Sequence, residues 1–450
     1  MRQADVMVLG TGPAATRVAI KCAEAGKDVA IADPRPYGGT CALRGCNPKR
    51  VLVRAAELYD WIARAEGTGV QVDQSTVDWG KLIAFKRSFT DPVTPWKEKK
   101  FDKAGITQLH GEPRFVSPNH VAVGNEELDC AQIVIATGAV PVSLDVPGWE
   151  LLITSDDFLE LDELPSRVVF VGGGYVTFEF AHVAARAGAN VTIVELGPRP
   201  LPNFDLDLVD CLVDRTRELG IDLQVSTEVV AIESTSTGGY VVHTKSGQAS
   251  SSFDTDMVVH GAGRVPNVAG LDLEAGTVRY GRQGIEVDGH LRSVSNPAVY
   301  AAGDVAATGA PALSPVASEE GRTLAHNLLE EKPRKPDYGP VPTVVFSVPA
   351  LAAVGLGEKE ARRQGLQFEV RSGDRARDNS MKKVAAKHAR YKVLVEKSSD
   401  RILGAHLLGP DAAETINLFA LAMKAGVPAT EMKSTLFAFP TFAHDVRGML

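Results

Sequence analysis

Two cysteines five positions apart are the residues of this chain best suited to redox chemistry. Cys41 and Cys46 follow the glycine pair at 38–39, and the 450-residue chain has only five cysteines. A thiol pair can alternate between dithiol and disulfide, and can thereby exchange two electrons with a neighbouring cofactor. From the pair alone, two unrelated buried cysteines would be the alternative interpretation.

The spacing of the two cysteines restricts where they can form a disulfide. Five residues of ideal helix would turn the two side chains about 140° apart, whereas a disulfide needs its Cα atoms within about 7 Å. We therefore expect a helix that begins at this point with an irregular backbone, which Gly45 makes accessible. The positive end of that helix, together with Lys49 and Arg50, would favour the thiolate.

The segment before the cysteines predicts a dinucleotide-binding unit. A buried strand at 6–9 and a helix that ends at Gly26 flank the turn Gly10-Thr11-Gly12-Pro13-Ala14-Ala15. A second strand at 29–32 ends in Asp33, 23 positions after the first glycine of the turn. The glycines admit a pyrophosphate to the helix N-terminus, and the acid can accept hydrogen bonds from a ribose.

The same pattern recurs in the middle of the chain. Strands at 168–171 and 191–194 flank a helix and the turn Gly172-Gly173-Gly174-Tyr175-Val176-Thr177. The second strand ends in Glu195, again 23 positions after the first glycine. Two such units predict two bound dinucleotides. A carboxylate at Glu195 favours NADH over NADPH because it repels a 2′-phosphate, although Arg199 could weaken that preference.

Three further predicted strands are each followed by a short sequence that is suited to contact a cofactor. Strands at 133–135, 257–260 and 298–302 precede, respectively, Ala136-Thr137-Gly138, the run Gly261-Ala262-Gly263-Arg264-Val265-Pro266-Asn267, and Gly303-Asp304. An acid at the carboxyl end of a strand is well placed to bind a cofactor hydroxyl in an open α/β sheet. The alternative role for Asp304 is that of a helix N-cap.

Composition sets limits on the class of protein. The net charge is −8 and no long basic run occurs, which argues against nucleic acid as a partner. No apolar run approaches the roughly 20 residues of a membrane span, and no signal-peptide pattern opens the chain. An odd number of cysteines does not suit a secreted disulfide framework, so we expect a cytoplasmic protein. We also expect no metal site.

Together these motifs resemble those of the pyridine nucleotide-disulfide oxidoreductases, in the branch of glutathione reductase, dihydrolipoamide dehydrogenase and mercuric reductase. The resemblance covers essentially the whole chain. It implies an α/β fold with two Rossmann-like domains and a C-terminal α+β dimerisation domain. The implied divisions are an FAD-binding domain with the redox cysteines (1–145), an NAD(P)H-binding domain (146–264), a return segment of the FAD domain (265–336) and an interface domain (337–450).

The resemblance also implies cofactors, partners and residue roles. FAD and NADH, with NADPH as the alternative, would serve a homodimer that passes electrons to a small-molecule acceptor. Cys41 would attack the substrate, and Cys46 would face the flavin as a charge-transfer thiolate. Arg50 would replace the family's lysine and pair with Glu179 near the flavin. The other cofactor-binding positions implied are Gly10, Gly12, Pro13, Ala14, Ala15, Asp33, Gly39, Thr40, Ala136, Thr137, Gly138, Gly172, Gly174, Tyr175, Val176, Glu195, Gly263, Arg264, Gly303 and Asp304.

The chain departs from the family pattern near its C-terminus. Disulfide reductases of the family carry H-P-x-x-x-E, whose histidine protonates the leaving thiolate, but here the same register reads Phe439-Pro440-Thr441-Phe442-Ala443-His444. Phenylalanine cannot transfer a proton, so His444 is the candidate replacement acid. Three activities follow as alternatives: a disulfide reductase with an unusual acid or substrate, a metal-ion or quinone reductase, and a low-turnover redox sensor.

Overall fold

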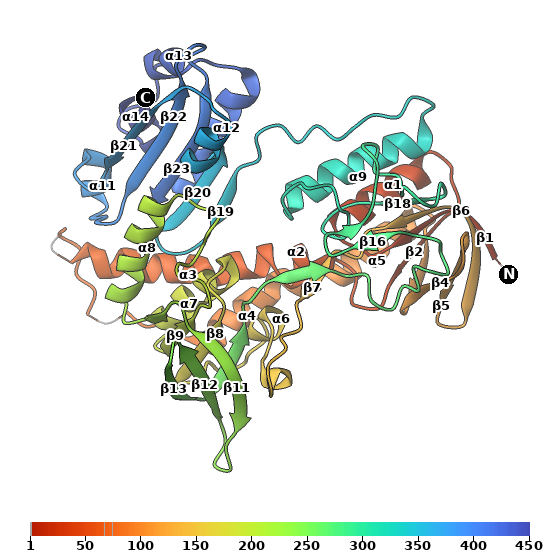
Figure 1. The fold of residues 1–450 in the computed structure, drawn as a ribbon, viewed down its shortest axis with the longest axis horizontal. Coiled ribbons are helices and arrows are strands. Elements are labelled where there is room, and N and C mark those ends of the chain that lie inside the picture. Colours follow the sequence, from red (N-terminus) through yellow and green to blue (C-terminus); the bar gives the residue numbers. More distant parts are fainter. Residues whose placement is uncertain (1, 67, 74) are drawn as a thin grey trace. The chain divides into compact units, whose positions relative to one another are not determined.

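The computed structural model describes residues 2–66, 68–73 and 75–450, and divides them into two compact units (Figure 1). The first unit comprises the chain up to Pro48 together with Phe85–Val142 and Arg264–Tyr338. The second comprises Lys49–Ala84, Ser143–Gly263 and Gly339–Leu450. The chain thus crosses between units close to the expected boundaries at 145, 264 and 336, but residues 49–84 are grouped with the second unit.

A seven-stranded sheet forms the centre of the first unit. Its order is β3-β2-β1-β6-β5-β4, with β18 paired beside β5 on the same edge of β6. Strands β3, β2, β1, β6 and β18 run parallel, and β4 and β5 form an antiparallel extension. The strands are β1 (Arg2–Leu9), β2 (Val29–Asp33), β3 (Thr107–His110), β4 (Pro113–Ser117), β5 (His120–Val123), β6 (Glu126–Ile135) and β18 (Val299–Ala301).

Both faces of this sheet are buried, which explains its nearly continuous apolar strands. Val6 and Val8 pack into one hydrophobic cluster, with residues of α1 (Pro13–Glu24), α5 (Val93–Lys103) and α9 (Ser314–Leu329). Met7 and Leu9, which alternate with them, pack into a second cluster on the opposite face. The register aligns Leu9 with Ile135, and Ile135 with Ala301, so the loops after β1, β6 and β18 leave one edge of the sheet.

Short elements complete the first unit. Two small antiparallel pairs, β7 with β15 and β16 with β17, lie outside the main sheet. The helix α2 carries Cys41, and a break at Arg44 and Gly45 separates it from the next helix. These elements are α2 (Gly39–Leu43), β7 (Ala139–Pro141), β15 (Arg264–Pro266), β16 (Tyr280–Gly281) and β17 (Gly284–Ile285).

The first part of the second unit contains the recurring strand–turn–helix pattern. Its parallel sheet has the order β10-β9-β8-β14 and is accompanied by the antiparallel sheet β11-β12-β13. The elements are η1 (Trp149–Leu151), α6 (Ser155–Phe158), β8 (Arg167–Val171), α7 (Tyr175–Arg186), β9 (Asn190–Val194), α8 (Leu206–Glu218), β10 (Asp222–Gln224), β11 (Glu228–Ser234), β12 (Tyr240–Ser246), β13 (Ala249–Thr255) and β14 (Met257–His260). Two helices, α3 (Cys46–Ala65) and α4 (Trp79–Thr90), have residues in both units.

The remainder of the second unit is an α+β domain. Its sheet, ordered β19-β20-β23-β22-β21, is antiparallel throughout. The elements are β19 (Thr343–Val345), β20 (Ala350–Gly355), α10 (Glu358–Arg363), β21 (Phe368–Asp374), α11 (Asn379–Lys383), β22 (Arg390–Glu396), β23 (Ile402–Gly409), α12 (Ala412–Ala425), α13 (Ala429–Ser434) and α14 (Phe442–Met449). The expected fold class, with two Rossmann-like sheets and a C-terminal α+β domain, is confirmed.

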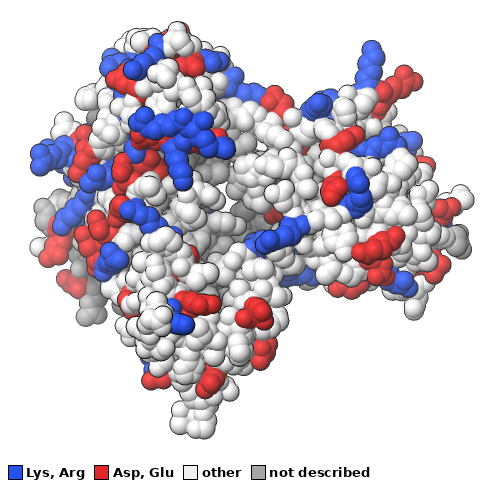
Figure 2. All heavy atoms as spheres, in the orientation of Figure 1, with Lys and Arg blue, Asp and Glu red and all other residues white. Residues whose placement is uncertain are grey.

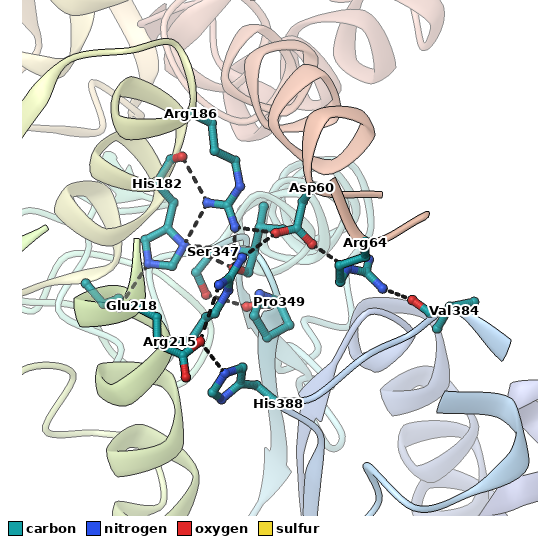
Figure 3. A network of polar contacts seen from close by, with 12 residues as sticks. Asp60, Arg64, His182, Arg186, Arg215, Glu218, Ser347, Pro349, Val384 and His388 are labelled. Carbon is teal, nitrogen blue, oxygen red and sulfur yellow. Dashed lines mark hydrogen bonds and ion pairs between the residues drawn. The ribbon is translucent and has the colours of Figure 1, made fainter. Parts of the chain in front are cut away.

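A buried charge network holds parts of the second unit together (Figure 3). One Asp60 oxygen accepts hydrogen bonds from Arg186 and Arg215, each 2.8 Å away, and the other accepts from Arg64 at 2.8 Å. Burial alone would raise the pKa of Asp60, but the three guanidinium groups lower it to about 2. Asp60 is therefore ionised at neutral pH and joins α3 to α7 and α8.

Surface charge is mixed rather than segregated. On the face shown in Figure 2, Lys and Arg side chains lie among Asp and Glu side chains. No helix among the described residues combines the length and the apolar character needed to cross a bilayer.

Candidate functional site

The first glycine turn has the backbone geometry that its sequence predicts. Gly10 adopts a positive φ of 108°, and a Cβ there would lie 2.4 Å from the Ala136 carbonyl oxygen. The loops after β1 and β6 therefore approach each other more closely than any side chain would allow. Gly12 caps α1 without a capping side chain, and a Cβ there would meet no atom within 4 Å. Pro13, Ala14 and Ala15 form the first turn of α1.

Hydrogen bonds connect Asp33 to the start of the cysteine segment. One carboxylate oxygen accepts a hydrogen bond from Thr11 at 2.6 Å, and the other accepts from the Arg35 backbone at 3.0 Å. The Thr11 hydroxyl in turn accepts from the Gly38 backbone N–H at 3.1 Å. A Cβ on Gly39 would lie only 2.5 Å from the Gly12 Cα, so α2 begins directly against the glycine turn.

The predicted cofactor positions Thr137, Gly138 and Arg264 also lie in the first unit. The Thr137 hydroxyl donates to the Asn267 carbonyl at 2.6 Å, and the Asn267 N–H donates to Gly138 at 2.9 Å. Arg264 donates to the carbonyl oxygen of Ala139, and β7 pairs with β15. Thr137 and Gly138 thus lie beside Asn267, and the following strand β7 pairs with β15, which Arg264 opens.

Asp304 follows β18, as predicted. Burial raises its pKa, and the charge of Arg264 opposes that shift. The neighbouring Gly303 N–H donates to Glu320 at 2.5 Å, and Glu320 also accepts from Thr308 at 3.1 Å. Glu320, on α9, is a buried carboxylate beside the site that the sequence did not single out.

The two predicted redox cysteines differ from the buried ones. Cys41 is half-buried on α2, and Cys46 is exposed as the first residue of α3. The Cys46 Sγ atom lies 3.4 Å from the Ser314 hydroxyl at the N-terminus of α9. Burial instead raises the pKa of Cys22 to about 11 and that of Cys130 to about 12. Cys41 and Cys46 are therefore not buried in the way that Cys22 and Cys130 are.

The second glycine turn repeats the first within the other unit. Gly172 has a φ of 105°, and a Cβ there would lie 2.6 Å from the Gly261 carbonyl oxygen. Gly174 caps α7 without a capping side chain, and Tyr175 and Val176 open that helix. Thr177 is fully buried at a position where Gly or Ala is usual. It fits there because Gly261 has no Cβ atom, which would otherwise collide with the Thr177 hydroxyl.

Glu195 lies at the end of β9, against the glycine turn. Its carboxylate accepts hydrogen bonds from the Gly173 backbone and, at 2.6 Å, from the Gly197 backbone. Arg199, which could have altered the nucleotide preference, instead pairs with Asp210 at 2.6 Å.

The expected pairing of Arg50 with Glu179 is wrong, because Lys49 takes that place. The Lys49 ammonium lies 2.6 Å from Glu179 Oε1, and both side chains are almost completely buried. Consecutive helix residues point about 100° apart, so Lys49 and Arg50 cannot both face α7. Arg50 pairs instead with Glu57 at 2.8 Å. A lysine one position earlier than the family motif was the available signal.

The C-terminal motif lies on α14 and the segment before it. Phe439 is 77% exposed, and its ring packs edge-on against His444 with centroids 4.9 Å apart. Among the described residues, the structure gives His444 Nδ1 no hydrogen-bond partner. Phe439 and Pro440 also line a cavity of about 340 Å³, together with Asn379, Ser380, Lys382, Lys383, Thr441 and Asp445.

Two family models match nearly all of the chain. Residues 4–321 match the pyridine nucleotide-disulphide oxidoreductase model, and residues 341–449 match the dimerisation domain of that family. The fold and the site define an oxidoreductase that works with FAD and a nicotinamide nucleotide. The chain belongs to the class I pyridine nucleotide-disulphide oxidoreductase family. Its dimerisation domain supports a homodimer.

Individual relatives agree over almost their full lengths. A glutathione reductase of Burkholderia cepacia is 35% identical over 98% of this chain and 97% of the relative. A dihydrolipoyl dehydrogenase of Trypanosoma brucei brucei is 32% identical over 98% and 95%. The structure of the HOCl-induced flavoprotein disulfide reductase RclA from Escherichia coli matches with a TM-score of 0.88 and 28% identity, over 99% of both chains.

The residues present fit both cofactors. Each glycine turn opens a 12-residue helix whose N-terminal N–H groups carry no side-chain cap, which suits an anionic pyrophosphate. A Cβ on Gly12 would meet no atom within 4 Å, so the N-terminus of α1 is open to a ligand. A carboxylate stands at the end of the following strand in each unit, Asp33 in the first and Glu195 in the second. In the described part of the chain, no group of three or more His, Cys, Asp or Glu side chains is placed to hold a metal ion.

Proposed function

We propose that the protein is an NADH-dependent flavoenzyme that reduces small-molecule disulfides through Cys41 and Cys46. The observation that carries this proposal is the placement of the two thiols on either side of a helix break, with α2 beginning against the glycine turn of α1. A break of this kind releases the pair from ideal helical spacing, which would hold the thiols apart.

Each residue then has a chemical task. The N–H groups at the start of α1 bind the pyrophosphate of FAD, and Asp33 and Asp304 accept hydrogen bonds from its hydroxyls. When bound, the flavin supplies the exchange between a hydride donor and a thiol pair. Cys46 receives the electrons, and Cys41 attacks the substrate disulfide.

The nicotinamide side belongs to the second unit. The start of α7 binds the second pyrophosphate, and Glu195 accepts from the ribose 2′-hydroxyl, which favours NADH. Lys49 and Glu179 form a buried ion pair between α3 and α7, the two residue types that the family places near its flavin. Lys49, rather than Arg50, carries this role in the proposal.

A metal-ion reductase is the second candidate. Phe439 offers no proton, and a thiol-bound metal ion needs none on accepting electrons. The RclA protein of Escherichia coli, which shares 27% identity with this chain, has been solved as a Cu(II) complex. The relative rates with disulfides and with Cu(II) therefore decide between the two candidates.

A reductive titration tests the proposal. Purified protein should release flavin on denaturation, and NADH should produce a long-wavelength charge-transfer band. Cys46→Ser should abolish the band, and Cys41→Ser should retain it. Glutathione disulfide and lipoamide should then be turned over faster than Cu(II). Protein without flavin, or the opposite behaviour of the two serine variants, would refute the assigned roles.

A further inference from the structure

Lys97 differs from the other lysines of α5 in where its ammonium lies. Lys99 and Lys103 are exposed and Lys100 is half-buried. Lys97 is also half-buried, and it donates a hydrogen bond of 2.9 Å to the Thr16 hydroxyl on α1. Thr16 is itself buried. The Lys97 ammonium is therefore directed into the first unit, towards the helix that carries the first glycine turn.

The helix that carries Lys97 is fixed to the start of the cysteine segment. The Thr94 hydroxyl donates to the Tyr37 carbonyl oxygen at 3.0 Å, one residue before Gly38. A Cβ on Gly38 would lie 2.8 Å from the Val93 side chain, so the two backbones approach closely. The first turn of α5 thus packs on the residues that lead into α2.

The same cluster contains Cys41. Thr16 lies one turn into α1 from Gly12, to whose carbonyl its N–H donates at 2.9 Å, and Gly39 of α2 packs against Gly12. Cys41 follows Gly39 by two residues. These contacts bring α1, α2 and α5 together within one unit and place Lys97 within electrostatic reach of the Cys41 sulfur.

The environment of Lys97 makes its ammonium unusually acidic. Burial lowers the pKa of Lys97 to about 8, the charge of Lys100 acts in the same direction, and Cys41 opposes the shift. An ordinary lysine has a pKa of about 10.4. A group with a pKa near 8 is mostly protonated at neutral pH and gives up its proton readily, which is what a general acid requires.

We propose that Lys97 donates the proton to the thiolate released when Cys41 attacks a small-molecule disulfide. This inference rests on the proposed function and supplies the acid that Phe439 cannot provide. The Cys41 thiolate forms a mixed disulfide with one half of the substrate, and the other half leaves as a thiolate that takes the Lys97 proton. Cys46 then loses its proton to solvent and displaces the first half, which leaves as a thiolate and takes a proton from solvent. Lys97 also regains a proton from solvent.

The exchange is balanced in electrons and protons. The Cys41–Cys46 dithiol loses two electrons and two protons and becomes a disulfide. The substrate disulfide gains both and leaves as two thiols. NADH restores the dithiol through the established reductive half of the family's reaction.

Three lysine variants of the flavin-loaded enzyme test the proposal. In Lys97→Met, stopped-flow oxidation of the reduced enzyme by glutathione disulfide and by lipoamide should slow by about 10²-fold or more. Lys97→Arg keeps the charge but holds its proton too tightly, and should also be slow. Lys99→Met removes an exposed charge from the same helix and is the matched control, with rates close to wild type.

Two readouts separate proton donation from a structural role. In the wild type the oxidation rate should fall as the pH rises through about 8, and this dependence should be absent in Lys97→Met. Oxidation by menadione, which expels no thiolate, should stay within about twofold. Thr16→Val removes the hydrogen bond to Lys97 without removing the acid, and should shift the pH dependence while keeping it.

Two results with the Lys97 variants would contradict the inference. If Lys97→Met and Lys99→Met are oxidised by disulfides at the same rate, or if the pH dependence persists in Lys97→Met, the inference is wrong. In that case dithiol reduction by NADH would still support the proposed function. Wild-type enzyme whose dithiol NADH does not reduce would overturn both.

Discussion

The Lys49 ammonium lies 2.6 Å from the Glu179 carboxylate, and the Phe346 backbone N–H donates to the same oxygen at 2.9 Å. The pair joins the first turn of α3 to α7. Its side chains are 12% and 3% exposed, so the charges depend on each other rather than on water. Removing one partner of such a pair leaves the other charge buried without compensation.

Lys49→Met should therefore destabilise the protein by about 3 kcal/mol or more. Arg50→Met is the matched control on the same helix, because its pair with Glu57 is partly exposed and contributes less than about 1 kcal/mol. Urea unfolding of the two flavin-loaded variants provides the measurement. Equal losses of stability would mean that the Lys49–Glu179 pair contributes no more than the partly exposed Arg50–Glu57 pair, and a larger loss in Arg50→Met would favour Arg50, as the sequence alone suggested.

Glu195 should set the preference between NADH and NADPH. Its carboxylate is held at the glycine turn by the Gly173 and Gly197 backbones, where a 2′-phosphate would meet its negative charge. The wild type should prefer NADH, and Glu195→Gln should reduce that preference about tenfold, or about 1.4 kcal/mol. Steady-state kcat/KM values with both nucleotides measure the effect.

Arg199→Met provides the control for this prediction. The Arg199 guanidinium pairs with Asp210 at 2.6 Å, so its removal should change the preference by less than twofold. A wild-type preference for NADPH of tenfold or more would show that a cation, rather than Glu195, dominates the pocket.

Asp60 should give the protein an acid-dependent loss of stability. Its pKa is lowered to about 2, below the unfolded value of about 3.9. The unfolded chain binds this proton first as the pH falls, so the contribution is complete above about pH 4 and disappears between about pH 4 and pH 2. Asp60 should contribute about 2–3 kcal/mol above that window.

Asp60→Asn tests this dependence. The variant should be less stable at neutral pH, and its unfolding free energy should change less between pH 4 and pH 2. Asp73→Asn, which removes an exposed carboxyl, should retain the wild-type slope. Parallel pH profiles for wild type and Asp60→Asn would show that the network in Figure 3 does not hold the ionised carboxylate preferentially.

The parts of the fold that the sequence predicted are those set by local chemistry. Gly10 and Gly172 both adopt positive φ values that favour glycine, and each follows a buried strand. The break between Cys41 and Cys46 was also expected, because regular helix would have separated the thiols. The antiparallel sheet of β11, β12 and β13 was missed, since its many exposed polar residues hide the strand alternation.

The site residues that the sequence missed depend on tertiary contacts. Lys49 and Arg50 are adjacent cations, and only the rotation of α3 decides which one meets Glu179. Lys97 belongs to a lysine-rich helix that resembles a solvated scaffold, and only packing against α1 buries its ammonium. Glu320 could not be recognised without knowing that α9 lies beside Gly303.

Phe439 occupies the position at which disulfide reductases of the family carry their acid. Phe439→His combined with His444→Glu restores the family's motif and should add a proton donor worth about 10²–10⁴-fold where none exists. If Lys97 already supplies the proton, the gain in disulfide reduction should be small in the wild type and large in Lys97→Met. Two donors that act on the same step cannot contribute additively. Phe439→Leu, which removes the aromatic ring without adding an acid, is the control and should give no gain in either background. Stopped-flow oxidation by glutathione disulfide measures all the variants, and an equal gain in both backgrounds would show that Lys97 and the restored histidine serve different steps.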